Sequence, residues 1–113
     1  MEIEKDIVYL YGFSTRKQVY FDSLLSIVSK QIEINVSIAI VLIHDGVIGT
    51  SQRGIMPGLL DKMLNLSISV FALIPDLLAR GIELNTVDPR IKCIEYRDLV
   101  DILTQAPKVA SWM

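Results

Sequence analysis

Short apolar runs alternate with amphipathic segments along the whole chain. The apolar runs are rich in β-branched residues and predict four strands, over residues 7–11, 36–43, 67–73 and 91–95. Apolar residues at helical spacing follow each run and predict helices over residues 17–31, 57–65, 75–80 and 97–105. Such alternation of strand and helix is typical of a layered α/β domain.

The run from Val36 to Ile43 has the strongest strand signal. It is nearly all aliphatic and β-branched, which suits a central strand buried on both faces of a parallel sheet. The run ends in His44-Asp45-Gly46, a turn signal, and a polar, glycine-containing loop follows as far as Gly58. We therefore place this strand at the centre of the sheet.

Residues that favour helix ends support the predicted helices. Ser14 or Thr15 is expected to cap the first helix by accepting a hydrogen bond from a free N–H group. Pro75 begins the third helix and Gly81 ends it, while Pro107 prevents the last helix from continuing.

Length and composition indicate one domain, spanning residues 1–113, that associates with other chains. A chain of 113 residues normally forms a single core. The apolar fraction is 51% and the mean hydropathy is +0.45, which is high for a small free-standing body with a large surface. We therefore expect an oligomer.

Charge and hydropathy exclude other classes of protein. The longest apolar run, residues 38–43, is far shorter than the roughly 20 residues of a membrane helix, so no transmembrane segment is expected. The N-terminus carries charges of both signs and lacks the pattern of a secretory signal, which favours a cytoplasmic location. The net charge is −2 and the 11 basic residues are scattered, so direct binding of nucleic acid is not expected.

The single cysteine, Cys93, is the first candidate for chemistry. A sulfur or acyl transfer enzyme needs an exposed thiolate in electropositive surroundings. Cys93 instead lies inside a predicted strand, and strand alternation points the neighbouring Lys92 to the opposite face. Isolated cysteines are among the most buried residues, so we favour a structural role for Cys93.

His44 and Asp45 are the second candidate, because open α/β sheets bind ligands at the carboxyl ends of their strands. We favour a simpler interpretation, in which Asp45 bonds local backbone N–H groups of a turn. Arg80 ends the third helix and is expected to stabilise that helix end, with an interface salt bridge as the alternative.

Established motifs for enzymes and cofactors are missing from the sequence. It has no Gly-x-Ser-x-Gly element of a hydrolase and no phosphate-binding glycine spacing. One histidine and one distant cysteine cannot supply a zinc site. We therefore expect no cofactor and no metal.

Several segments in a fixed order resemble one family. They are Asp45-Gly46-Val47 after the central strand, Phe71-Ala-Leu before Asp76-Leu-Leu-Ala-Arg-Gly, Ile94-Glu-Tyr-Arg-Asp-Leu-Val, and Trp112 near the end. Their order and spacing are similar to those of the TusB/DsrH family of sulfur-relay subunits. The similarity covers residues 36–113 well and the first strand and helix loosely.

This resemblance implies a DsrE-like three-layer α/β/α sandwich with a mainly parallel sheet of four or five strands. It also implies assembly with TusC/DsrF-like and TusD/DsrE-like subunits into a heterohexamer, with a homo-oligomer as the alternative. Such complexes pass persulfide sulfur between proteins, toward 2-thiouridine at the tRNA wobble position or within dissimilatory sulfur oxidation.

The resemblance also bears on the site residues. In such complexes the main sulfur-carrying cysteine belongs to the TusD/DsrE-type subunit, and some DsrH-type members have a cysteine in the first helix. The first helix here has none, and Cys93 matches neither position. We therefore expect a non-catalytic subunit that makes contacts through Trp112 as an aromatic anchor and through the loop of Asp45, Gly46 and Val47.

Two alternatives remain open at this point. The first is a stand-alone sulfurtransferase that uses Cys93. The second is a small-ligand binding domain with its crevice beside His44 and Asp45.

Overall fold

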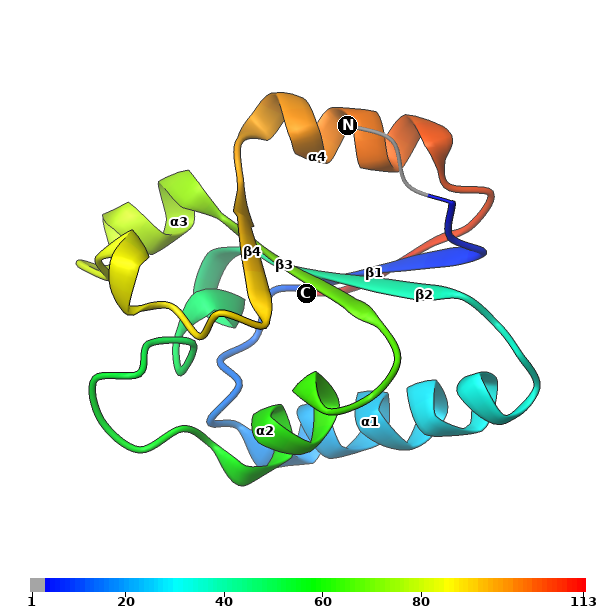
Figure 1. The fold of residues 1–113 in the computed structure, drawn as a ribbon, viewed down its shortest axis with the longest axis horizontal. Coiled ribbons are helices and arrows are strands. Elements are labelled where there is room, and N and C mark those ends of the chain that lie inside the picture. Colours follow the sequence, from blue (N-terminus) through cyan, green and yellow to red (C-terminus); the bar gives the residue numbers. More distant parts are fainter. Residues whose placement is uncertain (1–3) are drawn as a thin grey trace.

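A five-stranded parallel sheet forms the middle layer of the protein (Figure 1). The structure, a computed structural model, describes residues 4–113. The strand order is β4-β3-β2-β1-β5. The strands are β1 (Ile7–Tyr11), β2 (Ile38–Leu42), β3 (Ser69–Leu73), β4 (Ile91–Ile94) and β5 (Val109–Trp112).

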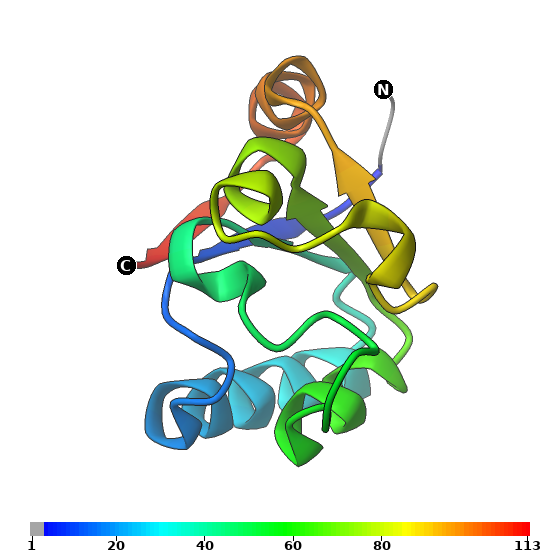
Figure 2. The same ribbon diagram turned by 90° about the vertical axis from the view of Figure 1, so that its left-hand side faces the viewer.

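Helices cover both faces of this sheet, as Figures 1 and 2 show. One face carries α1 (Gln18–Glu33) and α2 (Gly58–Leu64), and the other carries α3 (Ile74–Ala79) and α4 (Tyr96–Gln105). Two short 3-10 helices, η1 (His44–Val47) and η2 (Leu84–Thr86), complete the fold. The arrangement confirms the predicted α/β class and the three-layer sandwich that the resemblance implies.

Strand β2 contributes side chains to two apolar clusters, one on each face of the sheet. All five of its side chains are buried. Ile38, Ile40 and Leu42 pack with Phe21 and other residues of α1 and α2, while Ala39 and Val41 face the cluster of α4. A strand covered on both faces has no position for polar side chains, which explains why the sequence of β2 shows no alternation.

Strand β5 is the one strand that the sequence analysis did not predict. It pairs in parallel with β1, from Val8 opposite Val109 to Tyr11 opposite Trp112. None of its four residues is fully buried, so the apolar pattern is weak. The strand forms because Pro107 ends the preceding helix and β1 offers a free edge for pairing.

Helix α1 begins without the predicted cap. Lys17 occupies the N-cap position and makes no side-chain hydrogen bond there. Ser14 Oγ accepts a hydrogen bond from the backbone N–H of Arg16, and Thr15 Oγ1 donates to the carbonyl oxygen of Ile48. The cap prediction was wrong because the fully buried Thr15 hydroxyl satisfies a distant backbone group instead.

A charged cluster fixes the start of β4 to α2. Arg90 donates from Nε to Asp88 Oδ1 and from Nη2 to Asp88 Oδ2, each at 3.0 Å. The same guanidinium reaches Asp61 at 2.9 Å and Asn65 at 2.8 Å. The hydrogen bonds from Arg90 hold the pKa of the buried Asp88 carboxyl below its usual value, although burial acts in the opposite direction.

The Asp88 carboxylate makes stability depend on pH. Because its pKa is lower in the folded than in the unfolded chain, its contribution is present above the unfolded value of about 3.9 and is lost as the pH falls through the folded value. We predict that the urea midpoint falls between about pH 6 and about pH 3, and that Asp88→Asn weakens this dependence. Glu33→Gln, at an exposed carboxylate, is the control. Identical pH dependence in Asp88→Asn and the wild type would contradict this prediction.

Candidate functional site

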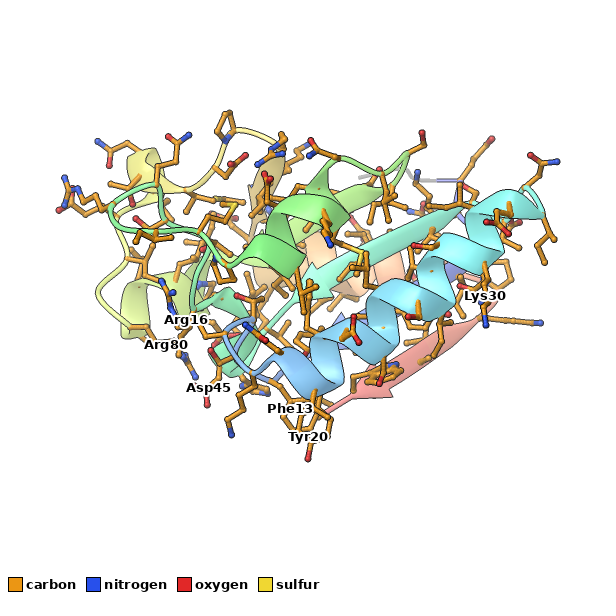
Figure 3. All side chains as sticks on the ribbon, turned by 90° about the horizontal axis from the view of Figure 1, so that it is seen from below. Phe13, Arg16, Tyr20, Lys30, Asp45 and Arg80 are labelled. Atoms are coloured by element: carbon orange, nitrogen blue, oxygen red, sulfur yellow. The ribbon has the colours of Figure 1, made fainter. Side chains whose placement is uncertain are left out.

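The polar residues of the candidate site lie at the carboxyl edge of the sheet. Strand β2 runs into η1, which carries His44 and Asp45, and the neighbouring β3 runs into α3, which carries Asp76 and Arg80. Because adjacent parallel strands end at the same edge, these two segments meet there. Figure 3 shows the labelled side chains of Asp45 and Arg80 next to each other.

An ion pair joins the two segments. Arg80 Nε and Nη2 both donate to Asp45 Oδ1, at 3.1 and 3.0 Å. Arg80 Nη1 donates to the carbonyl oxygen of Asp76 at 3.2 Å and lies 3.9 Å from Asp76 Oδ1. Asp45 lies in the 3-10 turn η1, where the sequence predicts a turn, but its carboxylate binds a guanidinium 35 residues away and not the local N–H groups that we expected.

The backbone N–H of His44 connects this residue to Asp76 and Arg80. Its N–H donates to Asp76 Oδ2 at 2.8 Å, and its φ of 50° places it in the left-handed region. The residue itself is exposed. Asp76 was not predicted as a site residue, although its position directly after Pro75, in the first turn of α3, favours a carboxylate that accepts hydrogen bonds.

The buried residues Gly46 and Val47 hold η1 against the rest of the fold. A Cβ atom at Gly46 would overlap the carbonyl oxygen of Tyr11, so no side chain fits there. That carbonyl accepts a hydrogen bond from the N–H of Ile43 at 3.0 Å, and Val47 is fully buried. Of the predicted contact loop of Asp45, Gly46 and Val47, only Asp45 is therefore exposed.

Trp112 lies at the end of β5 and pairs with Tyr11 of β1. Its side chain is half-buried and packs against the core cluster of α1 and α2. Its carbonyl oxygen accepts a hydrogen bond from Gly12 at 2.8 Å. The predicted aromatic anchor is thus partly used within the chain itself.

An aromatic cluster that the sequence analysis missed surrounds Tyr11. Its ring makes edge contacts with Phe13 and Phe21, at 5.9 and 5.2 Å between centroids, and Phe13 stacks on Tyr20 at 4.4 Å. The Tyr11 hydroxyl is buried and has no hydrogen-bond partner among the described residues. Burial, with Tyr20 nearby, raises the pKa of Tyr11 to about 12, so this phenol is neutral at physiological pH.

Cys93 lies in β4, at the opposite edge of the sheet from β5. Its half-buried side chain packs against the cluster of α1 and α2, whereas the neighbouring Lys92 is exposed. Burial raises the pKa of the Cys93 thiol, so the thiol form predominates near neutral pH. Its position within β4 and its raised pKa are unlike those of a reactive cysteine, whose thiolate is stabilised by cationic groups or a helix N-terminus.

Residues 4–113 contain no group of three or more histidine, cysteine or acidic side chains that could hold a metal ion. Within the same residues no helix is long and apolar enough to cross a membrane. In the candidate site, the Asp45 carboxylate accepts a hydrogen bond from Arg80, and the Asp76 carboxylate accepts one from the backbone N–H of His44.

Comparison with known proteins connects this geometry to a family. Residues 14–109 match the family model described as DsrH like protein. The chain belongs to the TusB/DsrH family. Protein TusB of Buchnera aphidicola subsp. Baizongia pistaciae (strain Bp) is 40% identical over 53 residues, which is 47% of this chain and 55% of that protein. The match therefore spans about half the length of this curated relative.

Two solved structures share the fold of this TusB/DsrH chain. The ychN protein from E. coli has a TM-score of 0.73 at 22% identity, over 96% of this chain and all of that one. MTH1491 from Methanobacterium thermoautotrophicum, a protein of unknown function, has a TM-score of 0.75 at 15% identity with the same coverage. At these identities the likeness shows the fold alone.

Two of the segments that carry the TusB/DsrH resemblance meet in space. One is Asp45-Gly46-Val47 in η1, which follows β2, and the other runs from Asp76 to Gly81, which begins inside α3 and ends just after it. The Asp45–Arg80 ion pair joins them directly. Two residues that are 35 positions apart in the sequence therefore meet at the edge of the sheet.

The close approach of Gly46 to the Tyr11 carbonyl leads to a prediction about the stability of the fold. We expect Gly46→Ala to destabilise the protein by about 1–3 kcal/mol, because the new methyl group displaces η1 from the Tyr11 carbonyl. Gly58→Ala is the matched control, since a Cβ there has open space. Urea unfolding gives both free energies, and equal stability of the two variants would contradict the expectation.

Proposed function

We propose that this TusB/DsrH-family chain is a non-catalytic subunit of a cytoplasmic sulfur-relay complex. The family resemblance implies complexes that move persulfide sulfur between proteins. Within such a complex this chain supplies structure and contact surface. The sulfur-carrying thiolate belongs to a companion subunit.

The environment of Cys93 carries this proposal. A sulfur carrier needs a thiolate that attacks the outer sulfur of a persulfide, and thiolates form beside cationic groups or helix N-termini. Cys93 instead lies within β4, packs against the core, and has a raised pKa because of burial. Its neighbour Lys92 is on the other face of the sheet, where it cannot stabilise the thiolate.

Exposed apolar side chains support the role of a subunit. The exposed fractions of Val19, Ile34 and Ile55 are 77%, 73% and 86%, and Tyr96 and Val100 on α4 are 59% and 56% exposed. Apolar surface on several sides of a small domain is typical of a chain that contacts partners. The proposed partners are TusC/DsrF-like and TusD/DsrE-like chains, and they decide between tRNA thiolation and sulfur oxidation as the destination of the sulfur.

Co-expression tests the proposed partners. We expect a tagged full-length chain to co-purify with TusC-like and TusD-like chains from its own organism in equal amounts. The Cys93→Ser variant should assemble equally well and leave sulfur transfer by the complex unchanged, because Cys93 carries no sulfur in this scheme. Light scattering after gel filtration and a sulfur-transfer assay measure the two outcomes. Loss of transfer with intact assembly would refute the non-catalytic role.

Persulfide labelling separates the proposal from a stand-alone sulfurtransferase. After exposure to a persulfide donor near neutral pH, the folded chain should gain no sulfur at Cys93, while the urea-unfolded chain should react because its thiol is no longer buried. Intact-mass spectrometry of both samples provides the comparison. Rapid labelling of the folded chain would favour catalysis through Cys93.

A further inference from the structure

An open groove lies between α1 and α2, on the face of the protein away from α3 and α4. Figure 3 shows the two helices side by side on this face. The groove has a volume of about 570 Å³. Its walls contribute three residues each: Gln18, Val19 and Asp22 from α1, and Gly58, Leu59 and Lys62 from α2.

Exposed apolar side chains lie in and beside this groove. Val19 in the α1 wall is 77% exposed, and Ile55 in the loop before α2 is 86% exposed. Arg16 Nη2 donates to the carbonyl oxygen of Ile55 at 3.2 Å, which holds the loop beside the first turn of α1. This apolar surface is therefore held in place before any partner arrives.

The charges of the groove have opposite signs on its two walls. Asp22 belongs to α1 and Lys62 to α2. Within residues 4–113 neither side chain forms an ion pair or a hydrogen bond, and both residues are exposed. An acid and an apolar residue on one wall, with a base and an apolar residue on the other, form a self-complementary pattern.

We propose that this groove is an interface between two copies of the chain, related by a two-fold axis that passes through it. Such an axis brings Asp22 of each copy opposite Lys62 of the other, so that two equivalent ion pairs form. Val19 and Leu59 then cover each other across the axis, and Ile55 lies at the border of the contact.

Because the groove carries one acidic and one basic residue, a second copy of the chain fits it better than a partner with charges of a single sign. Nucleic acids and anionic membranes attract surfaces of one sign, and the groove carries one acid and one base. A two-fold partner satisfies both charges with the same pair of residues. The inference does not depend on the sulfur-relay role, because self-association is a property of the purified chain.

Charge reversal tests the interface with sedimentation velocity over a concentration series. We expect the purified wild-type chain to form dimers, and Asp22→Lys or Lys62→Asp to raise the dimer Kd by about tenfold or more, since each reversal spoils both equivalent pairs. The double variant should recover dimer formation, because the two walls exchange charges. An equimolar mixture of the two single variants should form mixed dimers for the same reason.

Val19→Ser should weaken the dimer, whereas Ile34→Ser should not, although Ile34 at the other end of α1 is 73% exposed. Circular dichroism checks that every variant remains folded. A wild-type chain that stays monomeric at the highest concentration overturns the proposal, even if it binds related subunits. Single reversals without effect, or a double variant that does not recover, overturn it as well.

Discussion

Strand β2 is stable only when both of its faces are covered, because all five of its side chains are apolar and buried. This requirement places α1 and α2 on one side of the sheet and α3 and α4 on the other. It also excludes polar side chains from the middle of the sheet, so the polar residues that follow β2 and β3 lie where these strands end. The ion pair of Asp45 and Arg80 at the carboxyl edge is a consequence of that arrangement.

At this edge, close packing contributes more to stability than charge does. The Asp45 side chain is 62% exposed, and exposed ion pairs typically contribute between about 0 and 1 kcal/mol. The contact between Gly46 and the Tyr11 carbonyl is buried and leaves no room for even a methyl group. The glycine therefore fixes the distance between η1 and β1, while Arg80 fixes the direction in which Asp45 points.

Features that depend on local sequence could be predicted, and those that depend on distant contacts could not. The aliphatic run of β2 and the proline and glycine at the ends of α3 gave these elements directly, and the ordered segments around Asp45 and Asp76 gave the family. Strand β5 was missed because its pattern is weak and its stability comes from pairing with β1. The pairing of Asp45 with Arg80 and the groove between α1 and α2 exist only once the sheet has formed, so no spacing along the chain reveals them.

The position of β5 has a consequence for synthesis of the protein. The outer neighbour of β1 is β5, whose residues 109–112 are translated about a hundred codons after β1. A nascent chain on the ribosome can pair β1 with β2 but leaves the other edge of β1 open, and open strand edges favour aggregation. Until residues 109–112 have left the ribosomal tunnel the sheet lacks β5, so translation products truncated before β5 expose the edge of β1 that β5 covers in the folded chain.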